Sequence, residues 1–411
     1  MSDVGLPLPR RAHSMLRPGQ TIAIIVLCLL TFGVVMVNSA DMRVTLVGSD
    51  QPVPELTAAG VVASRPTIYM VLAMAALTVG ALLPVRRMAS GVSSLRGEHD
   101  GFRPLALATL AILMICALVY VPGLAPEING ARRWLRLPVP GLGDSLSVQP
   151  SEIAKWAMVV MVAWAATLRA RFLGRFWVGL VPILIAVGVV SVVIVKEDLG
   201  TGALVGLVGC VMLLAAGARF WHFIVFVPFA GFGLAYAIMS SDYRMKRIMA
   251  FSDPYADPEG IGYHTIQSLA AIANGEGFGR GLGHGLQKFG YLPEARTDFI
   301  FAVICEELGI AGAALVCTLF IGLTWAGCTV ARREREMLPR LMVLGVTATV
   351  AIQAVINLMV VTGLAPTKGI ALPLLSSGGT GWILTSFCLG LVISIERTQP
   401  AAEELPAPAA A

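Results

Sequence analysis

Long apolar runs alternate with short polar segments over most of the 411-residue chain. An α-helix needs about 20 residues to cross the hydrocarbon core of a bilayer, and lipid offers no partner for an open backbone group. Ten runs reach or approach that length, and each is predicted to be a membrane-spanning helix: 20–38, 67–84, 104–122, 150–168, 177–196, 200–217, 220–239, 298–328, 341–363 and 375–396. The pattern therefore predicts an all-α integral membrane protein.

The composition agrees with this fold class. The chain is 56% hydrophobic and 13% charged, whereas soluble domains carry about 25% charged residues. Seven cysteines are spread through the apolar runs without a Cys-x-x-Cys pair, and we expect them to be small buried hydrophobes. Gln353 and Asn357, one turn apart in the ninth run, are expected to hydrogen-bond between helices. The net charge of +5 comes mostly from basic loops, so it gives no reason to expect a nucleic-acid partner.

Arginine and lysine in short loops set the orientation of a membrane protein, because they favour the cytoplasmic side. They gather in alternate loops and near both ends of this chain, so both termini are predicted to be cytoplasmic. Three parts follow: a cytoplasmic N-terminal segment (1–17), one polytopic membrane domain (18–396) with a large extracytoplasmic loop (240–297) between its seventh and eighth helices, and a disordered cytoplasmic tail (397–411). Outward loops also carry basic residues against this rule, which suggests that they bind an anion.

The extracytoplasmic loop contains two further patterns. Residues 263–273 have helical spacing of apolar positions and predict a short helix against the membrane surface. Residues 275–285 carry a glycine at every second position, which is typical either of a flexible linker or of a backbone that approaches a ligand closely. A dinucleotide fingerprint would need a strand before it and a helix after it, and neither fits. His264 and His284 are not at metal-ligand spacing.

Charged residues at several helix ends face the outer side of the membrane. Glu152 and Lys155 begin the fourth helix one turn apart and can pair, residues 196–198 (Lys-Glu-Asp) end the fifth, and Lys368 precedes the tenth. An ion-coupled transporter would bury such charges near the midplane. The one-sided cluster favours a site that opens to the exterior. Two alternatives remain: Glu152 and Lys155 can be a structural pair that fixes helix packing, and residues 196–198 can be a solvated helix end.

Asp298 stands where the polar loop passes into the eighth apolar run. We expect Thr297 to cap that helix, and the helix N-terminus and Arg296 to favour the charged form of Asp298. An ionised carboxylate at such a place can accept a proton from an attacking hydroxyl, or it can simply complement the helix dipole. Glu306, two turns deeper, can share the same cavity, whereas Glu307 points away and needs a partner on another helix.

Several ordered motifs resemble one family, the SEDS proteins, which are peptidoglycan polymerases of the FtsW/RodA/SpoVE type. The match covers most of the chain from about residue 129 to 390, and it rests on the segments NGARRWL (129–135), QPSEIAKW (149–156), EDLGTG (197–202), the run from GYHTIQSL to CEELG (262–309) and TGLAPTKGIALPLLSSGG (362–379). The chain departs from the usual SYGGSS of the family at 376–381 and from its usual EPD at 196–198. The family also has ten membrane helices with both termini inside.

The resemblance implies a glycosyltransferase that polymerises lipid II at the outer face of the cytoplasmic membrane. It carries the catalytic aspartate of the family's TDF motif onto Asp298, as general base, and the charged pair of the fourth helix onto Glu152 and Lys155. The QKFGYLPEA segment resembles the cell-division branch of the family more than the RodA-like elongation branch. The resemblance therefore implies a location at the division septum.

The leaving pyrophosphate of lipid II is anionic, so cations near the outer face would stabilise it. The candidates for the substrate cavity are Glu152, Lys155, Arg132, Arg133, Arg244, Lys246, Arg247, Lys288, Lys368 and Glu306. The chemistry also admits a divalent cation, Mg²⁺ or Mn²⁺, held through the pyrophosphate, but the sequence shows no ligand set for a dedicated metal site.

The resemblance implies a class B penicillin-binding protein, a transpeptidase, as partner, together with other division proteins and membrane lipids. Two other functions remain open from the sequence. A lipid II flippase would use the same cations without chemistry, and a noncatalytic scaffold would recruit division enzymes.

Overall fold

The computed structural model describes residues 16–42, 57–93, 102–121, 124–126, 133–137, 146–289, 291–377 and 379–399. The predicted N-terminal segment up to residue 15, the tail beyond 399 and Arg132 lie outside the described residues. Within these ranges the regular secondary structure is helical, apart from one antiparallel ribbon of two short strands. The prediction of an all-α membrane protein is confirmed.

The helices of the membrane domain correspond to the predicted apolar runs. In the described part, nine helical segments are long and apolar enough to span a bilayer, and Leu199–Ala215 (α8) is a shorter apolar helix. Their bounds are α1 Pro18–Ala40, α3 Arg65–Leu82, α5 Phe102–Ala117, α6 Pro150–Leu168, α7 Val181–Glu197 after the π-helical turn Phe176–Leu180, α9 Phe220–Ile224 with α10 Val227–Met239, α13 Ile300–Arg333, α14 Met337–Val361 and α15 Thr380–Arg397.

Besides three 3₁₀ turns (Leu118–Tyr120, Ala170–Phe172 and Pro254–Ala256), the described structure has four more short helices and one ribbon. The predicted helix at 263–273 is confirmed as α12, Tyr263–Gly275. The sequence did not predict α2 (Ala58–Val62), α4 (Val85–Ser93), α11 (Asp242–Ser252) or the ribbon. The ribbon pairs β1 (Leu135–Leu137) with β2 (Leu146–Val148), and it leads directly into α6.

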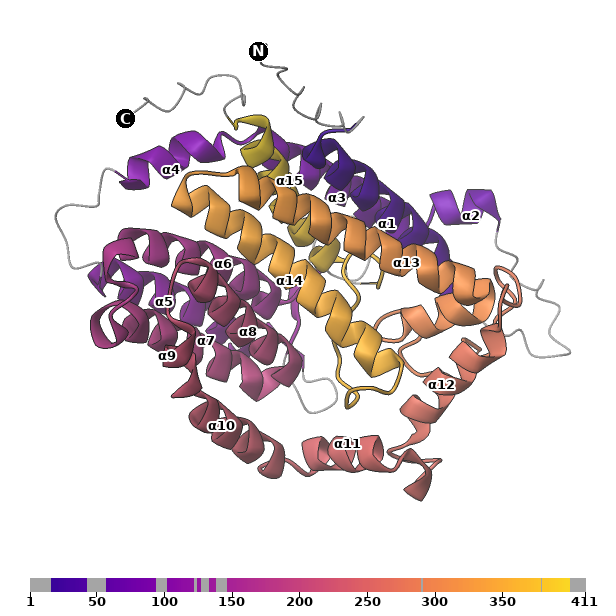
Figure 1. Ribbon diagram of the computed structural model, residues 1–411. Helices are drawn as coiled ribbons and strands as arrows, with labels where there is room; N and C mark the ends of the chain where they lie inside the picture. Colours follow the sequence, from indigo (N-terminus) through magenta and orange to yellow (C-terminus); the bar gives the residue numbers. More distant parts are fainter. Residues whose placement is uncertain are drawn as a thin grey trace, which may run out of the picture.

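Helices α13 and α14 lie side by side across the middle of the molecule, with α1, α3 and α15 on one side and α5 to α8 on the other (Figure 1). Small residues allow the closest contacts, since an added Cβ at Gly80 of α3 or Gly390 of α15 would overlap the backbone of the facing helix. Helices α10, α11 and α12 form an arc around the lower edge (Figure 1). No residue of α10 is buried within the chain, so this helix presents its apolar surface outward.

The glycine-rich loop after α12 packs on the first half of α13. The backbone N–H groups of Arg280 and Gly281 donate to the carbonyls of Glu306 and Glu307, each at 2.9 Å. Those carbonyls therefore bind the loop, and α13 is kinked at Gly309, where φ is +63°. An added Cβ at Gly275 would overlap the carbonyl oxygen of Cys305. The glycines thus allow close packing of backbone on backbone, which disagrees with the flexible-linker reading.

Candidate functional site

Asp298 lies in the turn that precedes α13, and its side chain is partly exposed. The helix begins at Ile300 with Phe299 as N-cap, so the prediction that Thr297 caps it is wrong. The Thr297 hydroxyl instead donates to a carboxylate oxygen of Glu294 at 2.7 Å. Glu294 has φ +53° and also accepts backbone bonds from Thr297 and Phe299, so its carbonyl closes this turn.

The surroundings of Asp298 favour its neutral form. Burial raises the pKa of Asp298 to about 7, and the carboxylates of Glu294 and Asp198 raise it as well, while the guanidinium groups of Arg247 and Arg133 oppose the shift. The expectation that the helix end keeps this group charged is therefore wrong, because desolvation outweighs the nearby positive charge. A carboxylate with a pKa near neutrality is suited to accept and release a proton at physiological pH.

Two basic residues of the loop before α13 form ion pairs away from Asp298. Arg296, expected beside the Asp298 carboxylate, pairs with Asp41 at 2.7 Å on the exposed surface. Lys288 pairs with Glu307 at 2.7 Å, and neither side chain has any solvent exposure. Its ammonium group also donates to the Ser39 hydroxyl of α1 at 2.9 Å. The Lys288 ammonium therefore links the loop between α12 and α13 to α1 and α13.

The two glutamates of α13 anchor the glycine-rich loop. Glu306 is fully buried and accepts backbone N–H bonds from Leu286 at 2.9 Å and from Gln287. The expectation that Glu306 shares the cavity of Asp298 is therefore wrong, because the folded loop covers that face of the helix. The expected partner of Glu307 on another helix is Ser39.

The predicted pair of the fourth helix is present. Lys155 lies 2.8 Å from Glu152, and the lysine side chain is only 2% exposed, against 16% for the glutamate. The Lys155 ammonium also donates to Gln353 Oε1 at 2.9 Å, and the Gln353 amide donates to the carbonyl of Ala371 at 2.9 Å. These bonds connect α6 through α14 to the loop 362–379, so the pair contributes to the architecture around the site.

A second group of charged residues (196–198), here called the wall, lies where α7 ends and α8 begins. Asp198 is buried and caps α8 by accepting from the backbone of Gly200 at 3.0 Å and from the Thr201 hydroxyl at 2.8 Å. A solvated helix end is therefore excluded for Asp198. Burial lowers the pKa of Lys368, while Asp198 opposes this shift, so the lysine of the loop lies near this wall.

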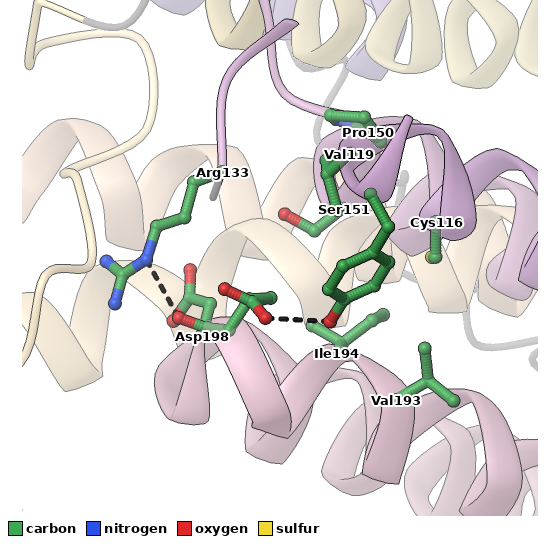
Figure 2. Close-up of a pocket in the computed structure, with 10 residues that line it drawn as sticks. Cys116, Val119, Arg133, Pro150, Ser151, Val193, Ile194 and Asp198 are labelled. Atoms are coloured by element: carbon green, nitrogen blue, oxygen red, sulfur yellow. Dashed lines mark hydrogen bonds between the residues drawn. The ribbon is translucent and has the colours of Figure 1, made fainter. Parts of the chain in front are cut away.

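A small pocket opens beside this wall between the ends of α5, α6 and α7 (Figure 2). Arg133 reaches over it and donates to the carbonyl of Glu197 at 2.8 Å, and Tyr120 donates to the Glu197 carboxylate at 2.7 Å. Figure 2 shows Arg133 and Asp198 at one end of the pocket and the apolar Val193 and Cys116 at the other. The pocket thus has a charged end and an apolar end.

The remaining basic candidates differ in placement. Arg247 of α11 donates to the carbonyl of Thr367 at 3.1 Å and stacks on the Tyr243 ring. Arg244 donates to the carbonyls of Val195 and Lys196, so it ties α11 to the end of α7. Lys246 is exposed. Among the described residues, Arg247 and Arg133 are the cations whose charge lowers the pKa of Asp298.

The described residues contain no group of three or more His, Cys, Asp or Glu side chains placed to hold a metal ion. His264 stacks on Phe299 with ring centroids 5.9 Å apart, and His284 contacts the carbonyl of Leu282. The contacts of both histidines are therefore structural. A divalent cation held by the substrate's own pyrophosphate stays a prediction.

Two neighbours of Asp298 escaped the sequence reasoning. Glu294 was not identified, although its carboxylate raises the pKa of Asp298; its backbone is left-handed, with φ +53°. Gly369 was quoted only as part of a motif. An added Cβ at Gly369 would lie 3.2 Å from Asp298 Oδ2 and 3.7 Å from Arg133 Nη1. The TKG motif was the available signal, but nothing in it indicates which side chains it faces.

The family model FTSW_RODA_SPOVE, described as "Cell cycle protein", matches residues 20–400. The probable peptidoglycan glycosyltransferase FtsW of Geobacter sulfurreducens is 38% identical over 304 residues, which cover 74% of this chain and 80% of that protein. The stage V sporulation protein E of Bacillus subtilis is 39% identical over 292 residues, which cover 70% and 78%.

Solved structures agree with this fold. One, titled "Structural coordination of polymerization and crosslinking by a peptidoglycan synthase complex", has a TM-score of 0.67 at 26% identity and covers 92% of this chain and 98% of its own. The rod shape determining protein RodA of Thermus thermophilus has a TM-score of 0.59 at 23% identity, over 92% and 96%. With a family model that spans nearly the whole membrane domain, the chain belongs to the FtsW/RodA/SpoVE family.

Proposed function

We propose that this protein is a peptidoglycan glycosyltransferase that polymerises lipid II at the outer face of the cytoplasmic membrane, with Asp298 as its general base. The observation that carries the proposal is a partly buried carboxylate whose pKa is raised to about 7 beside two guanidinium groups. The names of the family relatives support the reaction class, since several are probable peptidoglycan glycosyltransferases.

In this mechanism Asp298 accepts the proton of an acceptor sugar hydroxyl. The hydroxyl oxygen forms a bond to the sugar carbon that carries the pyrophosphate, and the bond from that carbon to the pyrophosphate breaks with its electron pair. Arg133 and Arg247 act on Asp298 and Lys368 lies near Asp198, and these cations would stabilise the charge that develops on the leaving group. Dissociation of the Asp298 proton then resets the site.

The similarity to proteins named FtsW, at 34% to 40% identity, favours a role in septal wall synthesis over RodA-like elongation. A neighbouring structure concerns a complex that coordinates polymerization with crosslinking. We therefore place the protein at the division septum with a class B penicillin-binding protein as partner, among other division proteins and membrane lipids.

Reconstitution in vesicles distinguishes the polymerisation of lipid II from its translocation across the bilayer. The purified protein and its transpeptidase partner are given labelled lipid II, and both the glycan products and the transfer of label across the bilayer are measured. We expect glycan strands from the wild type and none from Asp298→Ala, with unchanged lipid II binding. Polymerisation that survives Asp298→Ala would overturn the assignment of Asp298 as general base. Transfer of label across the bilayer without glycan products would favour a flippase.

A further inference from the structure

We propose that Asn357 and Gly369 act together as positioning residues, which hold the Asp298 carboxylate at a fixed gap from the Arg133 guanidinium. This inference rests on the proposed function, because it assigns a role to the gap in the polymerisation reaction. Neither residue is a catalytic residue, since neither supplies the proton acceptor or the charge.

Asn357 fixes the backbone on both sides of the site. It lies on α14 and is 1% exposed. Its side-chain nitrogen donates to the carbonyl of Asp298 at 2.8 Å and to the carbonyl of Ile370 at 2.7 Å. The two hydrogens of one amide nitrogen thus set the separation between the turn that carries Asp298 and the loop that carries Gly369. An apolar side chain of the same size cannot form either bond.

Gly369 leaves the space next to the carboxylate. An added Cβ would stand 3.2 Å from Asp298 Oδ2, which is tighter than ordinary van der Waals contact, and 3.7 Å from Arg133 Nη1. Gly369 does not have a positive φ, so alanine can adopt its backbone conformation. A substitution there therefore changes space and leaves the backbone preference unaltered.

The loop around Gly369 is anchored on both sides and cannot easily retreat. Arg247 donates to the carbonyl of Thr367 at 3.1 Å, and Gln353 donates to the carbonyl of Ala371 at 2.9 Å. With the loop held, a methyl group at position 369 must displace the Asp298 carboxylate by a few tenths of an ångström.

The gap has a chemical use in the proposed reaction. Asp298 Oδ2 and Arg133 Nη1 flank the same point above Gly369. A sugar hydroxyl beside the carboxylate and an anionic group beside the guanidinium can therefore be neighbours. A side chain at position 369 would occupy that space. Loss of the Asn357 amide would let the turn that carries Asp298 move relative to the loop that carries Gly369.

Two variants and two matched controls test the inference. Asn357→Leu removes both donated bonds, and Gly369→Ala adds one methyl group. Asn38→Leu is the control for the first, because the Asn38 amide of α1 donates to the Val34 carbonyl and to the Ser64 hydroxyl at the start of α3, outside the site. Gly277→Ala is the control for the second, because a Cβ there meets nothing within 4 Å. Rates are measured with labelled lipid II and normalised to folded protein.

We expect kcat to fall about tenfold in Gly369→Ala and about a hundredfold in Asn357→Leu, because misplacement of a reacting group by about 1 Å can cost 10²-fold. KM should stay near the wild-type value in both. The acid limb of the pH profile should move to lower pH in Asn357→Leu, because a released Asp298 is more hydrated. A purely structural role would reduce the yield of folded protein without moving this profile.

Rates and pH profiles equal to the controls in both variants would overturn the inference while leaving the proposed function intact. If Asn357→Leu does not fold, the kcat of Gly369→Ala decides. Failure of the wild type to form glycan, or activity of Asp298→Ala, would instead overturn the proposed function, so the two failures are distinguishable.

Discussion

The ion pair between Lys288 and Glu307 connects the loop between α12 and α13 to the helices on which it packs. Both side chains have no solvent exposure, and their charged atoms are 2.7 Å apart. We therefore predict that Lys288→Met destabilises the fold and leaves the affinity for lipid II unchanged. The sequence alone had placed Lys288 among the pyrophosphate ligands, so this substitution separates the two roles.

The magnitude follows from what Glu307 keeps after the change. Two charges 2.7 Å apart attract by about 6 kcal/mol at an effective dielectric constant of about 20, which sets an upper bound. Glu307 still accepts bonds from the Ser39 hydroxyl at 2.7 Å and from the Gly283 backbone at 3.0 Å, which offset part of the loss. Removal of one partner from a buried pair costs about 3–5 kcal/mol, and we expect a loss in this range.

Unfolding by SDS in mixed micelles measures the change in the free energy of unfolding, and lipid II binding is measured on the same samples. The double variant Lys288→Met with Glu307→Gln should lose less than the sum of the single losses. Arg296→Met is the control, because its pair with Asp41 is about half exposed and should contribute about 1 kcal/mol or less. Unchanged stability with weakened lipid II binding in Lys288→Met would refute the reasoning.

Two further predictions concern the site and its loop. Polymerisation should decline as the pH falls through about 7, because the base must be ionised and the pKa of Asp298 is raised to about 7; Glu294→Gln removes one cause of that shift and should move the decline to lower pH in a pH–rate series. Gly275→Ala should lower the thermal unfolding temperature, because its Cβ would overlap the carbonyl of Cys305, whereas an unchanged temperature would contradict the close packing of the loop.

The helices were predictable from the sequence because the apolar runs report directly on contact with lipid. The short helix α12 was found from its spacing, whereas α11 (Asp242–Ser252) was missed because four of its eleven residues are charged and it was taken as part of the polar loop. The kink at Gly309 was also missed. It depends on carbonyls that bind a distant loop.

The site was predictable where its members are near in sequence. Glu152 and Lys155 pair as expected because they share one helix face. Lys288 and Glu306 were placed in the cavity because helical geometry gives the face of a residue but not the loop that covers it. The charge state of Asp298 was misjudged for a similar reason, since desolvation comes from segments far apart in the chain.

The most direct test of the central claim compares two aspartates that differ only in place. Asp298→Asn removes the proposed base with little change in shape. Asp257→Asn makes the same change in an exposed loop, where the side chain accepts backbone bonds from Gly260 and Ile261. With labelled lipid II and gel separation of the products, we predict wild-type glycan strands from Asp257→Asn and none from Asp298→Asn. Glycan strands of wild-type yield from Asp298→Asn would contradict the account.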